Sequence, residues 1–312
     1  MTADPRDGSW RLPDDQPPDR LDRALKALLP GASWRDVRDL VARGKVAVDG
    51  CAANDAGARV TGGQRIDVRM DARRRDAAPP RTAALPAAAI VHGDRHVVVV
   101  HKPAGLDTVP WTGGEAAAAA DTLVQRLAAA LGGPVRVVHR LDRDTTGLLV
   151  FARTAEAEGR LAHQFRRHSV HRRYFALAHG RLGACTIRSH LADDRGDGLR
   201  GSVRDESRGR LAVTHVEVVE ELRGATLVAC RLETGRTHQI RIHLAERGHM
   251  LLGERAYVRE HEGAALPAPR ILLHAAELGF LHPSTDAPLR FVAPLPDDMQ
   301  AAVAALRAPP DG

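Results

Sequence analysis

His139-Arg140-Leu141-Asp142-Arg143-Asp144-Thr145-Thr146-Gly147 is the stretch of this sequence that decides the fold. It places the carboxylate of Asp142 between the guanidiniums of Arg140 and Arg143. An apolar run precedes it at 135–138 and another follows at 148–150, which predicts two strands joined by a tight polar turn. Nearby cations favour an ionised acid, so we expect a carboxylate at neutral pH. A surface Arg–Asp pair without a function is the alternative that these residues leave open.

The same stretch closely resembles the H-R-L-D-x-x-[T/S]-[S/T]-G signature of the RluA-type pseudouridine synthases. In that family the aspartate is the catalytic residue, so the resemblance implies that Asp142 has this role. Thr146 stands where the family more often has serine, and it keeps the hydroxyl.

A second segment, residues 170–177, alternates in a way that predicts a strand with Tyr174 on one face. By its chemistry alone Tyr174 also fits an ordinary core or rim residue. The resemblance implies that Tyr174 stacks on the target base and is needed for turnover. The chain has only two tyrosines, which makes this alignment unambiguous.

A third segment runs from Leu232 to Leu244 and contains G-R-T-H-Q-I-R, which is again similar to the family. We expect a strand at 227–232, a glycine turn, and a helix from about 237 to 248. The resemblance implies a salt bridge from Arg241 to Asp142, and a phosphate or substrate contact for Arg236. Lys102-Pro103-Ala104-Gly105-Leu106 resembles the family's K-P-x-G-L segment and predicts a structural loop. Gly253-Glu254 departs from the usual G-D pair, to which we attach little weight.

The first part of the chain predicts a small module of two helices and a short hairpin, with Ser33 capping the second helix and a turn at Asp49-Gly50. Its residue order is similar to the S4 RNA-binding domain. That resemblance implies RNA-phosphate contacts, and solvated helix charges are the alternative. The candidate residues are Arg20, Arg35, Arg38, Arg43 and Lys45.

The predicted organisation is a disordered tail (1–18), the S4-like domain (19–70), a linker rich in Arg and Pro (71–88), a catalytic domain (89–305) and a C-terminal tail (306–312). Within the catalytic domain we expect a helix over about 115–131. The resemblance spans roughly 19–305. It implies an α+β fold with a mixed, largely antiparallel central sheet flanked by helices, preceded by the small α/β S4-like domain.

Composition agrees with a polyanion-binding protein without proving one. The chain of 312 residues carries a formal charge of +6, almost all of it from arginine, which suits bidentate phosphate contacts. A genome-wide preference for arginine explains this equally well. Three scattered cysteines, no apolar leader and no apolar run of about 20 residues predict a reduced, cytoplasmic protein that does not span a membrane.

Other chemistries find no support in the sequence. The histidines at 163, 168, 171 and 179 fit no zinc spacing, so we expect no metal. The chain has no G-x-G-x-x-G, P-loop or G-x-S-x-G motif, so neither a nucleotide cofactor nor an acyl-transfer triad is indicated.

The resemblance implies that uridines in structured RNA are isomerised to pseudouridine by a monomer with no cofactor. The target base must be flipped out, and Arg140 is the candidate to fill the vacated stack. Whether Asp142 attacks or deprotonates the sugar stays open. Ribosomal RNA of the large subunit (23S) is the expected substrate. The alternatives are tRNA, an inactive RNA-binding protein, and an N-glycosidase that would release uracil.

Overall fold

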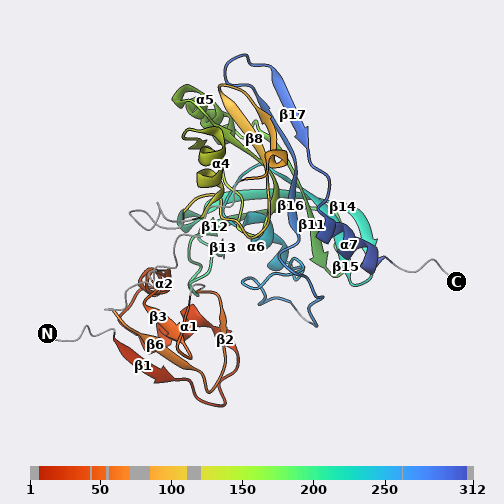
Figure 1. Ribbon diagram of the computed structural model, residues 1–312. Coiled ribbons are helices and arrows are strands. Elements are labelled where there is room, and N and C mark those ends of the chain that lie inside the picture. Colours follow the sequence, from red (N-terminus) through yellow and green to blue (C-terminus); the bar gives the residue numbers. More distant parts are fainter. Residues whose placement is uncertain are drawn as a thin grey trace. The chain divides into compact units, whose positions relative to one another are not determined.

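The structure is a computed structural model that describes residues 7–42, 44–53, 56–70, 85–110, 121–261 and 263–307. The chain divides into two compact units, Met1–Ala78 and Pro79–Gly312 (Figure 1). Each unit has its own hydrophobic core.

The first unit is a small α/β module. A four-stranded sheet has the order β1-β6-β3-β4, and β2 pairs with β5. Leu21, Leu25, Val37 and Leu40 from the two predicted helices are buried in its core. The elements are β1 (Gly8–Arg11), β2 (Asp19–Arg20), α1 (Leu21–Leu28), α2 (Trp34–Ala42), β3 (Val46–Val48), β4 (Cys51–Ala52), β5 (Arg59–Val60) and β6 (Arg65–Val68).

Local chemistry explains the turns of this unit. The Ser33 hydroxyl accepts a hydrogen bond from the Asp36 amide at 3.1 Å, and the Asp36 carboxylate accepts one from the Ser33 amide at 2.8 Å. This reciprocal pair caps α2. Asp49 and Gly50 have φ angles of 50° and 77°, the conformation that a tight hairpin turn requires.

The expected disordered tail over 1–18 is wrong where β1 forms. Residues Gly8–Arg11 pair antiparallel with β6, and Leu12 is buried in the core with Trp10 packed against it. These two apolar side chains pack beside β6, whose residues come about fifty positions later in the sequence. Local composition does not reveal a partner at that distance.

The second unit is built on one sheet, whose order is β13-β12-β14-β15-β11-β16-β10-β8-β7, with β17 on β16 and β9 on β10. Pairing is antiparallel except between β10 and β16. The fold is therefore the expected mixed, largely antiparallel sheet. Its strands are β7 (Ile90–Gly93), β8 (Val97–Lys102), β9 (Arg136–Val137), β10 (Thr146–Ala152), β11 (His171–His179), β12 (Cys185–Ala192), β13 (Gly201–Val203), β14 (Arg210–Leu222), β15 (Ala225–Leu232), β16 (Leu273–Leu281) and β17 (Pro288–Val292).

Helices cover both faces of this sheet. Val98 and Val100 of β8 pack with α4 (Leu123–Leu131), whereas Val97 and Val99 pack with α5 (Ala155–Arg166). A strand covered on both sides has no polar face, which explains the unbroken valine run. The last helices are α6 (Gln239–Ala245), which packs on β14, and α7 (Asp297–Leu306), whose Met299 and Val303 lie in a further core cluster (Figure 1).

Three expected boundaries differ from the structure. The helix expected over 115–131 begins at Leu123, because Thr122 adopts extended backbone and caps it with Gln125; residues 111–120 lie outside the described residues. Of the linker expected over 71–88, residues 71–84 are also outside them, but Leu85 is buried in the core. The start of the C-terminal tail expected at 306 is wrong, since Leu306 ends α7 and Arg307 pairs with Glu220 at 2.8 Å; residues 308–312 lie outside the described residues.

Gly147 ends the motif stretch because β10 and β16 come very close there. Its φ is 114°, and a Cβ atom built on it would lie 2.2 Å from the backbone oxygen of Ala275. No side chain fits between the two parallel strands at this point.

We therefore expect Gly147→Ala to lower the free energy of unfolding by at least about 3 kcal/mol, since both the backbone angle and the contact with β16 are violated. Chemical denaturation measures this. The matched control is Gly159→Ala in α5, where nothing lies within 4 Å of the added methyl group. There we expect a gain of about 0.5–1 kcal/mol. Equal stabilities for the two variants would contradict the packing argument.

Candidate active site

Asp142 lies in the loop between β9 and β10, and the backbone on both sides of it is held in place. The Thr108 hydroxyl accepts from the Leu141 amide at 3.2 Å and donates to the Leu141 carbonyl at 2.7 Å. After Asp142, the carbonyl of Arg143 accepts from the Lys102 ammonium at 2.7 Å. The carboxylate itself stays partly exposed, at 22% of its side chain. Asp142 therefore presents a solvent-accessible carboxylate on a backbone that hydrogen bonds hold in place.

Lys102 links the loop that follows β8 to the loop that carries Asp142. It is fully buried, and its ammonium donates to three carbonyls, those of Pro103, Leu106 and Arg143. Burial lowers its pKa to about 8. The K-P-A-G-L segment was expected to be structural, but the sequence did not show that its lysine fastens the loop that carries Asp142.

Arg241 of α6 reaches Asp142, its Nη1 lying 3.3 Å from Oδ2. On its other side the guanidinium makes two hydrogen bonds to Glu254, Nε to Oε2 at 2.7 Å and Nη2 to Oε1 at 2.9 Å. Glu254 also accepts the backbone amides of Arg255 and Ala256 at 3.0 and 2.8 Å. A bidentate pair of this kind fixes the plane of the guanidinium and leaves one edge for Asp142.

The Arg241–Glu254 pair is buried, and its pKa values reflect this. Burial alone would raise the pKa of Glu254, but the hydrogen bonds and charge of Arg241 hold it at about 2. The small weight given to Gly253-Glu254 in the sequence was a mistake, because this carboxylate is what orients Arg241.

Tyr174 of β11 is 8% exposed and lies in the main core cluster. Its pKa is raised by burial, and the charge of Asp142 contributes in the same direction. The hydroxyl therefore keeps its proton, and the ring lies within electrostatic reach of the carboxylate.

The two arginines beside Asp142 in the sequence do not pair with it. Arg143 pairs with Asp107 at 3.4 Å, and the exposed Arg140 donates to the Thr237 hydroxyl at 3.1 Å. The cation that approaches Asp142 is Arg241, 99 positions away. Arg140 and Arg143 therefore make their described side-chain contacts with groups other than the neighbouring carboxylate.

Arg236 lies in the turn before α6, where its Nε donates to the carbonyl of Leu211 at 3.0 Å. Burial and the neighbouring charge of Arg210 lower its pKa. The helix expected from 237 begins at Gln239, after His238 in a left-handed conformation. Every residue of α6 is buried, with Gln239 and His243 bonded to Thr214 and Arg241 reaching Asp142.

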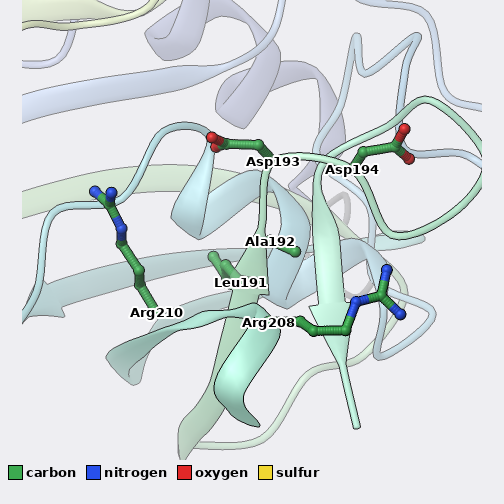
Figure 2. Close-up of a pocket in the computed structure, with 6 residues that line it drawn as sticks. All are labelled: Leu191, Ala192, Asp193, Asp194, Arg208 and Arg210. Atoms are coloured by element: carbon green, nitrogen blue, oxygen red, sulfur yellow. The ribbon is translucent and has the colours of Figure 1, made fainter. Parts of the chain in front are cut away.

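A polar pocket of about 360 Å³ opens beside Arg210, at the end of β12 (Figure 2). Two carboxylates and two guanidiniums line it, and neither Asp142 nor Tyr174 does. Figure 2 shows these four charged side chains separated from one another, with Leu191 and Ala192 between them. Its lining residues are Leu191, Ala192, Asp193, Asp194, Arg208 and Arg210.

The S4-like candidates have mixed surroundings. Arg20 makes two hydrogen bonds to the buried carboxylate of Asp22, at 3.0 and 2.8 Å, and Arg38 approaches the same group at 3.5 Å. Lys45 donates to the Met70 carbonyl at 2.8 Å. Arg35 is exposed on α2, and Arg43 lies outside the described residues.

Within the described ranges, no group of His, Cys, Asp or Glu side chains is arranged to hold a metal ion. Among the same residues, none of the helices has the length and apolarity needed to cross a membrane. Cys185 and Cys230 are free thiols.

Comparison with known proteins decides the family. Residues 96–246 match the model of RNA pseudouridylate synthases, and residues 19–66 match that of the S4 domain. A ribosomal large subunit pseudouridine synthase D of Zymomonas mobilis subsp. mobilis is 37% identical over 300 residues, which cover 90% of this chain and 92% of that protein. The chain belongs to the RNA pseudouridylate synthase family. It is an RNA pseudouridine synthase that carries an S4 domain.

Other members extend this match. The enzyme of the same name from Xanthomonas campestris pv. campestris is 35% identical over 327 residues, covering 98% of this chain and 96% of that protein. The solved structure of human RNA pseudouridylate synthase domain containing 4 shares the fold, with a TM-score of 0.57, 22% identity, and 72% of this chain and 95% of that chain covered. For human domain containing 1 the TM-score is 0.53 and the identity 25%, with 72% and 96% covered.

The depressed pKa of Glu254 predicts a specific acid sensitivity. Its folded pKa of about 2 lies below the ordinary value of 4.5, so the stabilisation is complete above pH 4.5 and is lost as the pH falls toward 2. We expect Glu254→Gln to reduce the free energy of unfolding by ~3 kcal/mol at pH 7, because Arg241 loses its buried partner.

Urea denaturation from pH 7 to pH 3 measures this difference. The gap between the unfolding free energies of wild type and Glu254→Gln should narrow as the pH drops below about 4.5, because Glu254 then takes up a proton in the unfolded state while it stays ionised in the folded state down to about pH 2. Two curves that stay parallel over the whole range would show that Glu254 does not titrate as described.

Proposed function

We propose that this protein isomerises uridine to pseudouridine in large-subunit ribosomal RNA, with Asp142 as the catalytic carboxylate. The observation that carries the assignment of Asp142 is its ion pair with Arg241, which joins two motif segments 99 positions apart. The RNA class is taken from the curated relatives, whose names specify the large ribosomal subunit.

The target uridine must leave its helix for this site to act on it. Arg140 is exposed at the loop tip, next to Asp142, and would occupy the vacated stack. Tyr174 would stack on the uracil, and Arg236 would contact a phosphate or the substrate. Arg241, fixed by Glu254, would hold the carboxylate in line before the substrate arrives, a preorganisation effect.

The reaction conserves all atoms of the nucleotide. The bond from uracil N1 to ribose C1′ breaks, the base rotates, and C5 bonds to C1′. The C5 proton leaves and N1 gains one, so the balance needs no cofactor. Asp142 either attacks C1′ or removes a proton from the sugar, and both routes start from an ionised carboxylate. We further propose that the protein acts in the cytoplasm as a monomer.

Asp142→Asn should lower uridine conversion by at least about a thousandfold, because an amide is neither a nucleophile nor a base. RNA affinity should stay within about threefold, since the neutral side chain keeps its shape and can still accept from Arg241. Release of tritium from C5 of a labelled ribosomal RNA transcript measures conversion, and filter binding measures affinity. A normal rate for the Asn variant would remove Asp142 from the reaction.

The same assay separates the alternatives. Free uracil in the product would indicate an N-glycosidase. Conversion of tRNA transcripts but not of ribosomal RNA would correct the substrate class, and no conversion by wild type would indicate an inactive RNA-binding protein. Carbodiimide mapping of RNA from cells with and without the gene then locates the uridine, as a stop that disappears in the deletion.

For the S4 domain we propose phosphate contacts from Arg20, Arg35, Arg38, Arg43 and Lys45, of which Arg35 is the exposed test case. Arg35→Ala should reduce the slope of log affinity against log salt by about one, because one phosphate contact and its released counterion are lost. Arg35→Lys, the control, keeps the charge and should keep the slope. An unchanged slope for the Ala variant would leave Arg35 as a solvated charge.

A further inference from the structure

His238 stands at the start of α6, between Tyr257 and the candidate catalytic carboxylate. Its Nδ1 lies 2.7 Å from the Tyr257 hydroxyl, and its Nε2 lies 3.8 Å from Oδ1 of Asp142. Arg241 approaches the other oxygen, Oδ2. The two oxygens of Asp142 therefore each face a different nitrogen group of the same short segment.

The proton positions follow from these contacts. If Nδ1 carried the proton and donated to Tyr257, the lone pair of Nε2 would point toward a carboxylate oxygen, which is repulsive. If Tyr257 donates to Nδ1, the proton is on Nε2 and points toward Oδ1, which is attractive. The hydrogen bond at one ring nitrogen sets the proton at the other. The second arrangement is therefore favoured.

Burial supports the neutral ring that this arrangement requires. It lowers the pKa of His238 to about 4, against the opposing charge of Asp142. Burial also raises the pKa of Tyr257, so its hydroxyl keeps the proton that it donates. The ring is further held by an edge contact with Tyr257, with centroids 5.6 Å apart.

We propose that His238 is a positioning residue for Asp142, with the Tyr257 hydroxyl fixing the tautomer that turns Nε2–H toward Oδ1. The inference rests on the proposed role of Asp142. At 3.8 Å the contact is longer than a hydrogen bond, and a shift of less than about 1 Å on RNA binding closes it. Arg241 and His238 then restrain both oxygens, and the carboxylate can no longer rotate.

A backbone role for His238 is the competing explanation, because its φ is 58°. Two variants separate the roles. Asparagine tolerates this left-handed conformation best but cannot place a donor at the Nε2 position. Glutamine tolerates it less well but carries an amide donor near that position. The donor role predicts that His238→Gln converts uridine at least about fivefold faster than His238→Asn at saturating RNA. A faster Asn variant would overturn the proposal.

Tyr257→Phe tests the tautomer itself. Losing one hydroxyl should lower kcat about tenfold and leave the KM for RNA unchanged, because only orientation of the carboxylate is affected. Thr186→Val is a matched control. Thr186 bonds to Nδ1 of His215 at 2.9 Å, and Nε2 of His215 bonds to Glu233 at 2.6 Å, the same three-group arrangement without Asp142. The control should keep the wild-type rate.

The tautomer of His238 can also be measured directly, without a variant of Tyr257. Nitrogen NMR of histidine-labelled wild type, with His238 assigned by its absence in His238→Gln, should show the proton on Nε2. A proton on Nδ1 would overturn the proposal even if every variant were inactive.

The outcomes also distinguish this inference from the proposed function. If wild type releases no tritium from ribosomal RNA, the proposed function fails. If wild type is active and Tyr257→Phe has the same kcat, only the role of the His238–Tyr257 pair fails.

Discussion

The second unit depends at its centre on one guanidinium shared between two carboxylates. Glu254 binds the Nε–Nη2 edge of Arg241 and is itself held by backbone amides, so the position of the arginine does not depend on Asp142. Nη1 then presents a fixed positive charge to Asp142. If the arginine had to be positioned anew in each catalytic cycle, the free energy of reorganisation would offset the electrostatic stabilisation that its charge provides.

The backbone around Asp142 is likewise fixed by hydrogen bonds from other segments of the chain. Thr108 holds the residue before it and Lys102 the residue after it; Lys102 is the last residue of β8, and Thr108 lies in the loop that follows this strand. The close approach at Gly147 then joins the loop's far end to β16. Three segments that are remote in sequence converge on one partly exposed side chain, and the sheet order is what brings them together.

Much of the fold could be predicted from local patterns. The apolar run at 148–150, the alternation around Tyr174 and the glycine turn before α6 each predicted a strand or helix that the structure contains, because their signals lie within a few residues. The chain around Trp10 was mistaken for a disordered tail, since its partner strand comes much later. The helix expected over about 115–131 is interrupted at Thr122, because composition does not reveal that this threonine adopts extended backbone and caps a helix that begins at Leu123.

Local sequence patterns predicted less of the candidate site than of the fold. The pairing of Asp142 with Arg241 came from family resemblance, and no spacing rule gives it. Arg140 and Arg143 flank Asp142 in the sequence, but their partners in the fold are Thr237 and Asp107, which proximity in the sequence does not reveal. Glu254 and Lys102 are anchors whose partners lie 13 and 41 positions away, and isolated charged residues look like surface charges until the fold buries them.

Because Lys102 is buried, chemical modification of its ammonium can report on local opening of this protein. It contains three lysines, Lys26, Lys45 and Lys102, and Lys102 has no exposed surface in the folded state. An amine-reactive reagent can modify that ammonium only while the surrounding loops are apart. The modification rate of a single peptide, followed by mass spectrometry, would therefore report how often the loop beside Asp142 opens.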